Sequence, residues 1–377
     1  MKHGDPNVSR KPCPLDRELH SIISLKWRMI LGKLLAIRKV FGKMTKINQP
    51  TPKERVFILP PETSRRIIVA LGGNAIQQAH ERGTAQEQLT NIRNACQHIV
   101  EMIKDGHKIV ITHGNGPQVG NLLIQQEGAE TRVPALPMDF CGAMSQGQIG
   151  YMLQQVMENL FRSEGINRDV LTVVTQVLVD REDPAFRNPT KPVGPFYDEA
   201  AAKMNEQKGY VIKEIKPGTG HRFRRVVPSP NPLRILEARA IKKMVDAGII
   251  LIASGGGGVP VVMDAKGDYH GVEAVIDKDL AGEKLAEAVM ADILLILTDV
   301  DKVYLNFGKP GQTPIDQVRL DQARAYLREG HFLSGSMSPK VEACLRFLEF
   351  GGERAMITGL DKASLALQGK AGTHFLP

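Results

Sequence analysis

Short apolar runs along the chain alternate with longer segments in which apolar residues recur every three or four positions. The apolar runs predict buried strands at 67–71, 109–112, 170–174, 249–253, 293–297 and, last in the chain, 354–357. The segments with helical spacing predict helices at about 86–104, 144–161, 233–246, 280–290 and 340–350. Strands that alternate with helices favour an α/β protein with a mostly parallel sheet covered by helices on both faces.

Three of the predicted strands run directly into glycine-rich turns. The turns are Gly72-Gly73-Asn74, His113-Gly114-Asn115-Gly116, and Ser254 followed by Gly255 to Gly258. Glycine lets the backbone turn sharply and come close to a ligand, and the N–H groups of a following helix suit an anion. In a parallel sheet such turns share the edge where ligands bind. The pattern therefore predicts a site that holds several phosphate or carboxylate oxygens, as phosphoryl transfer requires.

A segment of different composition interrupts the alternation between residues 182 and 232. It holds eight prolines and many charges, and it has little periodicity. Long irregular segments inside a compact domain are usually functional, so we expect a protruding Pro-rich subdomain or lid over 182–232. We expect the catalytic domain to span 66–377.

The net charge of +8 is concentrated near the N-terminus. Residues 1–66 contain 15 of the 49 lysines and arginines but only 5 of the 41 acidic residues, so the rest of the chain is close to neutral. This distribution argues against nucleic-acid binding by the folded body. We expect residues 1–65 to be a basic extension and linker. Within it, 19–44 has the pattern of an amphipathic helix, typical of a membrane-surface segment or a transit peptide; an upstream start codon is the alternative.

Hydropathy and cysteine usage indicate in which cellular compartment we expect the protein. No apolar run approaches the roughly 18 residues of a membrane-spanning helix, so we expect no transmembrane segment. The cysteines Cys13, Cys96, Cys141 and Cys344 are far apart and form no C-x-x-C pair. They favour reduced thiols and a cytoplasmic location, with an energy organelle as the alternative if residues 1–65 are a targeting sequence.

The cations of the predicted site must come from outside a P-loop. The sequence contains no G-x-x-x-x-G-K-[ST], and no G-x-G-x-x-G follows the first strand. Three lysines stand in unusual settings: Lys191 between prolines, Lys278 between two carboxylates, and Lys340 at the start of a predicted helix. A single lysine is usually a solvated surface charge, but a transferring phosphoryl group needs several positioned cations.

Seven stretches beyond Arg66 occur together in one order. They are Val69 to Ala75, Thr112 to Gly120, Ser145-Gln146-Gly147, Asn188 to Pro192, Val227 to Pro230, Ala274 to Asp279, and Gly335 to Lys340. In this combination the chain resembles the carbamate kinases of the amino acid kinase family, from about Arg66 to the C-terminus. It departs from the family pattern at Ser338, where members usually have glycine.

The resemblance implies reversible phosphoryl transfer between ATP and carbamate, which gives ADP and carbamoyl phosphate. In many organisms the family runs this reaction toward ATP in the breakdown of arginine or related nitrogen compounds. The resemblance also implies an open αβα sandwich around a mainly parallel eight-stranded sheet, and a homodimer. Mg²⁺ is expected to arrive with the nucleotide rather than in a protein metal site, because it prefers substrate phosphates and water.

Matched positions imply roles for individual residues. The catalytic group consists of Lys191 from the lid, Lys278 and Lys340 on the β- and γ-phosphates, and Asp279, which holds the lysines. Residues expected to line the phosphoryl group and the carbamate are Gly72, Gly73, Asn74, Gly114, Asn115, Gly116, Gly255 and Gly256. Residues expected to border the nucleotide are Asp299, Tyr304 and Met337.

Several alternatives stay open. The turn at 255–258 is either a ligand contact or only a tight connection. His113 is favoured as a structural residue over a general base, because carbamate is already an anionic nucleophile. Asp277 is expected to orient its loop.

Two rival functions share these features. Other kinases of the fold, which act on acetylglutamate, aspartate, glutamate or UMP, generally carry a lysine in the first strand-turn, and 67–74 has none. A catalytically silent sensor of carbamoyl phosphate or nucleotide would be expected to have lost one of the three lysines.

Overall fold

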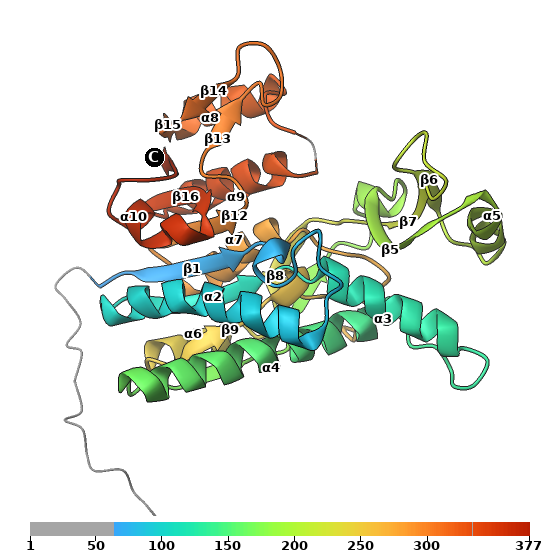
Figure 1. Ribbon diagram of the computed structural model, residues 1–377, viewed down its shortest axis with the longest axis horizontal. Helices are drawn as coiled ribbons and strands as arrows, with labels where there is room; N and C mark the ends of the chain where they lie inside the picture. The colour runs from blue at the N-terminus through green and yellow to red at the C-terminus, as the bar shows by residue number, and fades with distance from the viewer. Residues whose placement is uncertain (1–63, 334) are drawn as a thin grey trace, which may run out of the picture. The chain divides into compact units, whose positions relative to one another are not determined.

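The structure, a computed structural model, describes residues 64–333 and 335–377 (Figure 1). Its central sheet has eight strands in the order β15–β17–β16–β12–β1–β2–β9–β3. Their bounds are Arg66–Leu71 (β1), Lys108–His113 (β2), Val170–Thr172 (β3), Ile250–Ile252 (β9), Ile293–Thr298 (β12), Gln317–Arg319 (β15), Arg354–Gly359 (β16) and Thr373–Leu376 (β17). Only the β16–β17 pair is antiparallel. The mainly parallel eight-stranded sheet is confirmed.

Helices cover both faces of this sheet. One face carries α2 (Ala85–Lys104), α4 (Met138–Glu164) and α10 (Ala363–Leu367), and the other carries α6 (Ala238–Asp246), α7 (Lys278–Val289), α8 (Leu320–Arg328) and α9 (Met337–Phe350). Successive side chains of a strand point to opposite faces. In β1, Ile67 and Val69 therefore join the core beneath α2 and α4, whereas Ile68 and Ala70 join the core beneath α7 and α9. The strands are apolar throughout because both faces are buried, and the predicted αβα sandwich is confirmed.

The segment 182–232 forms regular structure of its own. Its elements are β5 (Lys191–Tyr197), α5 (Glu199–Gln207), β6 (Ile212–Glu214) and β7 (Phe223–Val227). The strands pair antiparallel in the order β5–β7–β6, and with α5 they form a small lobe at the right of Figure 1. The sequence showed little periodicity here because short strands interrupted by prolines leave no clear alternation. The role of this lobe as a lid stays a prediction.

Two smaller sheets complete the described part of the chain. One has the order β11–β10–β4–β8 and the other pairs β13 with β14. Their bounds are Gln176–Val179 (β4), Pro232–Ile235 (β8), Val259–Met263 (β10), Tyr269–Gly271 (β11), Val303–Leu305 (β13) and Thr313–Ile315 (β14).

Some element predictions need correction. The helix predicted at 233–246 begins only at Ala238, because residues from Pro232 pair with β4 as a strand. The helix α3 (Gly116–Ala129) was not predicted. The strand predicted as the last, at 354–357, is followed by β17, which reverses direction and pairs with it.

The predicted helix at 19–44, Cys13 and nearly all of the linker lie outside the described residues. Within residues 64–333 and 335–377, no helix has both the length and the apolar character that a membrane span needs.

Candidate active site

The three glycine turns meet at the carboxyl edge of the central sheet. After β1 the chain makes a short 3₁₀ turn at Gly73–Ala75, and after β2 it enters α3 at Gly116. A Cβ atom on Gly114 would lie 3.2 Å from the backbone nitrogen of Gly73, a tight contact, so glycine favours the close approach of these two turns. The third turn runs into β10 rather than into a helix.

The third turn packs against the second. Gly256 has a φ of +66°, and a Cβ atom there would collide with the side chain of Asn115. A Cβ atom on Gly255 would collide with the ring of His113. Close packing therefore explains these glycines, although Gly256 also faces the cavity described next.

A cavity of about 590 Å³ lies where the turns meet. The predicted residues that line it are Gly73, Gly114, Asn115, Gly116, Lys191, Gly256, Lys278, Asp279 and Lys340. Three predicted residues, Gly72, Asn74 and Gly255, do not line it. Gly72 instead faces the carbonyl of Leu297, and Asn74 donates a 3.4 Å hydrogen bond to Asp299.

Asp279 joins two of the lysines. Its Oδ1 lies 2.6 Å from Nζ of Lys278, and its Oδ2 lies 2.9 Å from Nζ of Lys340. Burial of Asp279 favours its neutral form, but the two ammonium groups outweigh burial and hold the pKa of this carboxyl below its usual range. Lys340 is partly buried, which disfavours its charged form, yet Asp279 keeps its pKa above the ordinary lysine value. Asp279 and Lys340 are therefore both ionised near pH 7.

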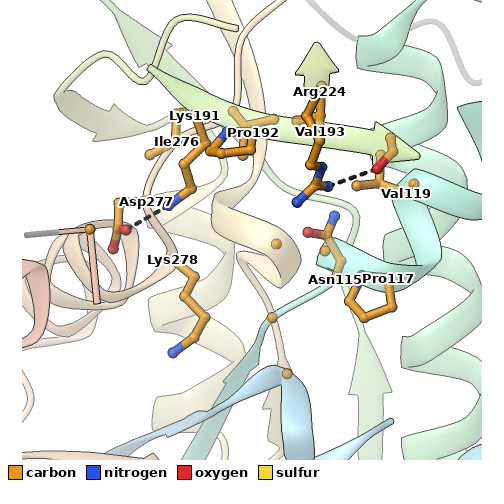
Figure 2. Close-up of a pocket in the computed structure, with 18 of the residues that line it drawn as sticks. Asn115, Pro117, Val119, Lys191, Pro192, Val193, Arg224, Ile276, Asp277 and Lys278 are labelled. Carbon is orange, nitrogen blue, oxygen red and sulfur yellow. Dashed lines mark hydrogen bonds and ion pairs between the residues drawn. The ribbon is translucent and has the colours of Figure 1, made fainter. Parts of the chain in front are cut away.

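Lys191 reaches the cavity from β5 of the small lobe, and its side chain points toward Asp277 (Figure 2). Its Nζ lies 3.0 Å from Oδ2 of Asp277. The other oxygen of Asp277 accepts a 2.9 Å hydrogen bond from the backbone N–H of Asp279, which caps α7. Asp277 therefore orients its loop, as predicted, and also pairs with Lys191 of the small lobe.

The start of α3 contributes further positive potential. Asn115 precedes the helix, but its side chain makes no capping bond; it donates instead to Oγ of Ser145 at 2.8 Å. The uncapped N-terminus of α3 thus faces the cavity, where its dipole favours an anion.

A second, smaller cavity of about 170 Å³ adjoins the first. Asp299, Tyr304 and Met337, the three residues predicted at the nucleotide, all line it. Phe307 and Phe332 add aromatic surface. Lys340 lines both cavities, so an elongated ligand in the second cavity can reach the lysines of the first.

His113 is structural in this arrangement. Its side chain is buried, and Nδ1 lies 2.9 Å from the carbonyl oxygen of Gly114. Burial lowers the pKa of His113 to about 4, so the imidazole is neutral near pH 7. His113 does not line either cavity.

Sequence reasoning missed one cation in the first cavity. Arg224 of β7 lines it from the small lobe. No motif marks this residue, because its approach depends on how β7 pairs within the lobe. Ser338, the departure from the family pattern, lies in the first turn of α9, and its N–H donates to the carbonyl of Leu333 at 3.1 Å.

Comparisons with known proteins show the family to which the chain belongs. The model of the amino acid kinase family matches residues 65–359. A carbamate kinase of Pyrococcus furiosus is 53% identical over 316 residues, which cover 83% of this chain and 99% of the relative. The chain belongs to the carbamate kinases.

Two further carbamate kinases extend the comparison. That of Trichomonas vaginalis is 47% identical over 83% of this chain and 99% of its own length. A solved structure of carbamate kinase from Giardia lamblia bound to AMP-PNP has a TM-score of 0.78 and 43% identity, and the match covers 83% of this chain and 99% of that one. Membership in the carbamate kinases favours carbamate kinase activity over the activities of the rival kinases of the fold and over a silent sensor.

Proposed function

We propose that this chain is a carbamate kinase that transfers a phosphoryl group reversibly between ATP and carbamate, and that it runs toward ATP in the breakdown of arginine or related nitrogen compounds. The observation that supports this most directly is the position of Lys340 between the two cavities. A nucleotide with its base near Tyr304 and Met337 would extend its phosphates past Lys340 toward Lys278. The solved structure of the relative from Giardia lamblia is bound to AMP-PNP, which supports an adenine nucleotide as a substrate of this chain.

The reaction needs charge stabilisation more than proton transfer. Toward ATP, an oxygen of the ADP β-phosphate attacks the phosphorus of carbamoyl phosphate, and the bond from phosphorus to the carbamate oxygen breaks. The electron pair stays on carbamate, which leaves as an anion without a proton. Lys278 and Lys340 would neutralise the transferring group, since fixed cations stabilise charge that develops in the transition state. Asp279 would hold both lysines in place.

The remaining predicted residues surround the reacting groups. Gly73 would let the backbone approach the phosphoryl group. Gly114, Asn115 and Gly116 would bind carbamate at the start of α3. Lys191 would reach the phosphoryl group or carbamate after leaving Asp277, since 32% of its side chain is exposed in the present ion pair.

A kinase that uses ATP implies a divalent metal, and we propose Mg²⁺. The carboxylates at the first cavity are already paired, Asp279 with two lysines and Asp277 with Lys191 and a backbone N–H. Among the described residues no group of three or more metal-ligating side chains occurs. The ion would therefore be held by nucleotide phosphates and water, where it offsets phosphate charge.

The decisive experiment is ATP formation from ADP and carbamoyl phosphate with Mg²⁺, with acetyl phosphate as the control donor. We expect fast turnover with carbamoyl phosphate and at least about tenfold less with acetyl phosphate. Bound nucleotide without turnover would contradict the proposal and would favour a sensor. Equal turnover with acetyl phosphate would indicate a different acceptor.

We further propose a homodimer formed through α4 and the edge strand β3. β3 is the last strand of the central sheet and has no neighbour on its outer side among the described residues. Phe140, Met144 and Tyr151 form one exposed stripe along α4, and Tyr151 is 62% exposed. Val174, just after β3, adds to this apolar face. Exposed apolar surface of this kind marks an interface, and a second copy with the same face would cover it.

We also propose that the catalytic domain spans 66–377, with 182–232 as its lid, and that it works in the cytoplasm. The described cysteines Cys96, Cys141 and Cys344 are unpaired and buried, which fits a reducing compartment. An energy organelle remains the alternative if residues 1–65 direct the chain there.

A further inference from the structure

Arg224 brings a fourth cation to the first cavity. It lies on β7, and its side chain points toward the start of α3, where Asn115 and Pro117 line the same cavity (Figure 2). Lys191 and Lys278 lie on the opposite side in this view. In this view Arg224 thus stands across the cavity from Lys191 and Lys278.

The guanidinium of Arg224 has unused donors. One nitrogen, Nη2, donates a 2.8 Å hydrogen bond to the carbonyl oxygen of Gly194, whereas the buried Nε has no partner among the described residues. The ring of Phe196 lies 5.0 Å from the guanidinium and shields it from water. An arginine offers five N–H donors, so donors beyond the one bonded to Gly194 are left for a ligand in the cavity that Arg224 lines.

Arg224 also differs from its neighbours in charge pairing. Arg222 pairs with Glu214 at 3.0 Å, and Arg225 pairs with Glu273 at 2.7 Å. In the described part of the chain no carboxylate pairs with Arg224. A half-buried guanidinium without a counter-ion is costly, and an anion bound in the cavity would remove that cost.

We propose that Arg224 is a substrate-binding residue that holds the carbamate end of the substrate. This inference rests on the proposed function. Carbamate carries two oxygens in one plane, and the guanidinium fork matches such a group with two parallel hydrogen bonds. In the direction of ATP synthesis, the bond from phosphorus to the carbamate oxygen breaks and its electron pair moves onto carbamate. Arg224 stabilises that growing charge while Lys278 and Lys340 hold the phosphoryl group.

The position of Arg224 also links substrate binding to the lobe. Its hydrogen bond to Gly194 ties β7 to β5, the strand that begins with Lys191. A carbamate held by Arg224 therefore contacts the same lobe that carries Lys191. Substrate binding would fix both cations over the cavity together.

The test compares Arg224→Gln and Arg224→Lys with the wild type. Steady-state ATP formation gives kcat and KM for carbamoyl phosphate and for ADP separately. We expect Arg224→Gln to lower kcat/KM for carbamoyl phosphate by about 30-fold or more, with the KM for ADP within about twofold of wild type. Arg224→Lys keeps the charge but loses the fork, so its loss should be smaller. Arg222→Gln is the matched control, since Arg222 lies outside both cavities, and it should stay within about twofold.

Calorimetric titration with carbamoyl phosphate in the absence of ADP separates this inference from the proposed function. Wild-type protein that binds carbamoyl phosphate without turnover would contradict the proposed function, and the variants would still test Arg224. Unchanged affinity and kinetics for carbamoyl phosphate in Arg224→Gln would overturn the inference. Equal losses for both substrates in Arg224→Gln and Arg224→Lys, with a lowered Tm, would also overturn it and would assign Arg224 a purely structural role in the lobe.

Discussion

Among single residues, Asp279 organises the catalytic lysines. It fixes Lys278 and Lys340 through its two oxygens and is itself almost fully buried.

We expect Lys278→Ala and Lys340→Ala each to lower kcat by about two orders of magnitude or more, because each removes a cation from the transferring group. Steady-state ATP formation measures this effect. Lys242→Ala, which removes only an exposed ion pair on α6, serves as the control. Turnover near the wild-type rate in both lysine variants would contradict the mechanism.

The sequence predicted the site residues that lie in recognisable local sequence motifs. Lys278 begins α7 and Lys340 lies in the first turn of α9, each next to a distinctive loop, and the structure brings both to one cavity. The sequence did not predict Arg224 or the pair of Lys191 with Asp277. Lys191 and Asp277 are 86 positions apart, and both contacts depend on how the lobe folds back on the sheet. Gly255 was predicted at the ligand but does not line the cavity, because its space is taken by His113.

Among the elements, α7 carries an unusual buried acid. Glu283 is fully buried, and neither carboxylate oxygen has a hydrogen-bond partner in the described part of the chain. The charged groups around it are Lys284 and Glu287 of α7 and Arg346 of α9. Burial, aided by Glu287, raises the pKa of Glu283 to about 8. The side chain is therefore mostly protonated in the folded protein near pH 7.

This shift predicts how stability depends on pH. Between the unfolded pKa of 4.5 and about 8, the folded chain holds a proton that the unfolded chain has released. Folding is therefore weakened as pH rises through this window. We expect Glu283→Gln to remove this dependence and to be more stable than wild type at pH 9 by about 1 kcal/mol or more. Urea unfolding at pH 6 and pH 9 measures the difference, with Glu342→Gln as the control on α9. An identical pH slope in wild type and Glu283→Gln would contradict the assignment.

The sequence predicted most central strands because both faces of the sheet are buried. A strand such as β12 is apolar along nearly its whole length, so its pattern is unambiguous. The hydrophobic pattern did not predict the element correctly where that element is short or half-exposed. β8 has two buried and two exposed residues, and its apolar positions merged with those of α6 into one predicted helix.

At the scale of the whole molecule, the site joins residues that lie far apart in the sequence. Gly73 near the start of the fold and Lys340 near its end line the same cavity. The order of the central strands brings this about, because β1 lies between β2 and β12. The matches to carbamate kinases cover 83% of this chain. This agrees with the sequence analysis, in which the resemblance runs from about Arg66 to the C-terminus.

The proposed homodimer gives a prediction at the same scale. Tyr151 and Val174 are exposed on the face of α4 and β3. We expect Tyr151→Asp and Val174→Asp each to convert a dimer into a monomer, because a carboxylate buried without a partner costs several kcal/mol. Size-exclusion chromatography with light scattering measures the mass, and Met204→Asp, at an exposed apolar position in α5, is the control. Neither Tyr151 nor Val174 lines the two candidate cavities, so the monomers should still form ATP. A monomeric wild type, or dimers that survive both substitutions, would show that this face is not the interface.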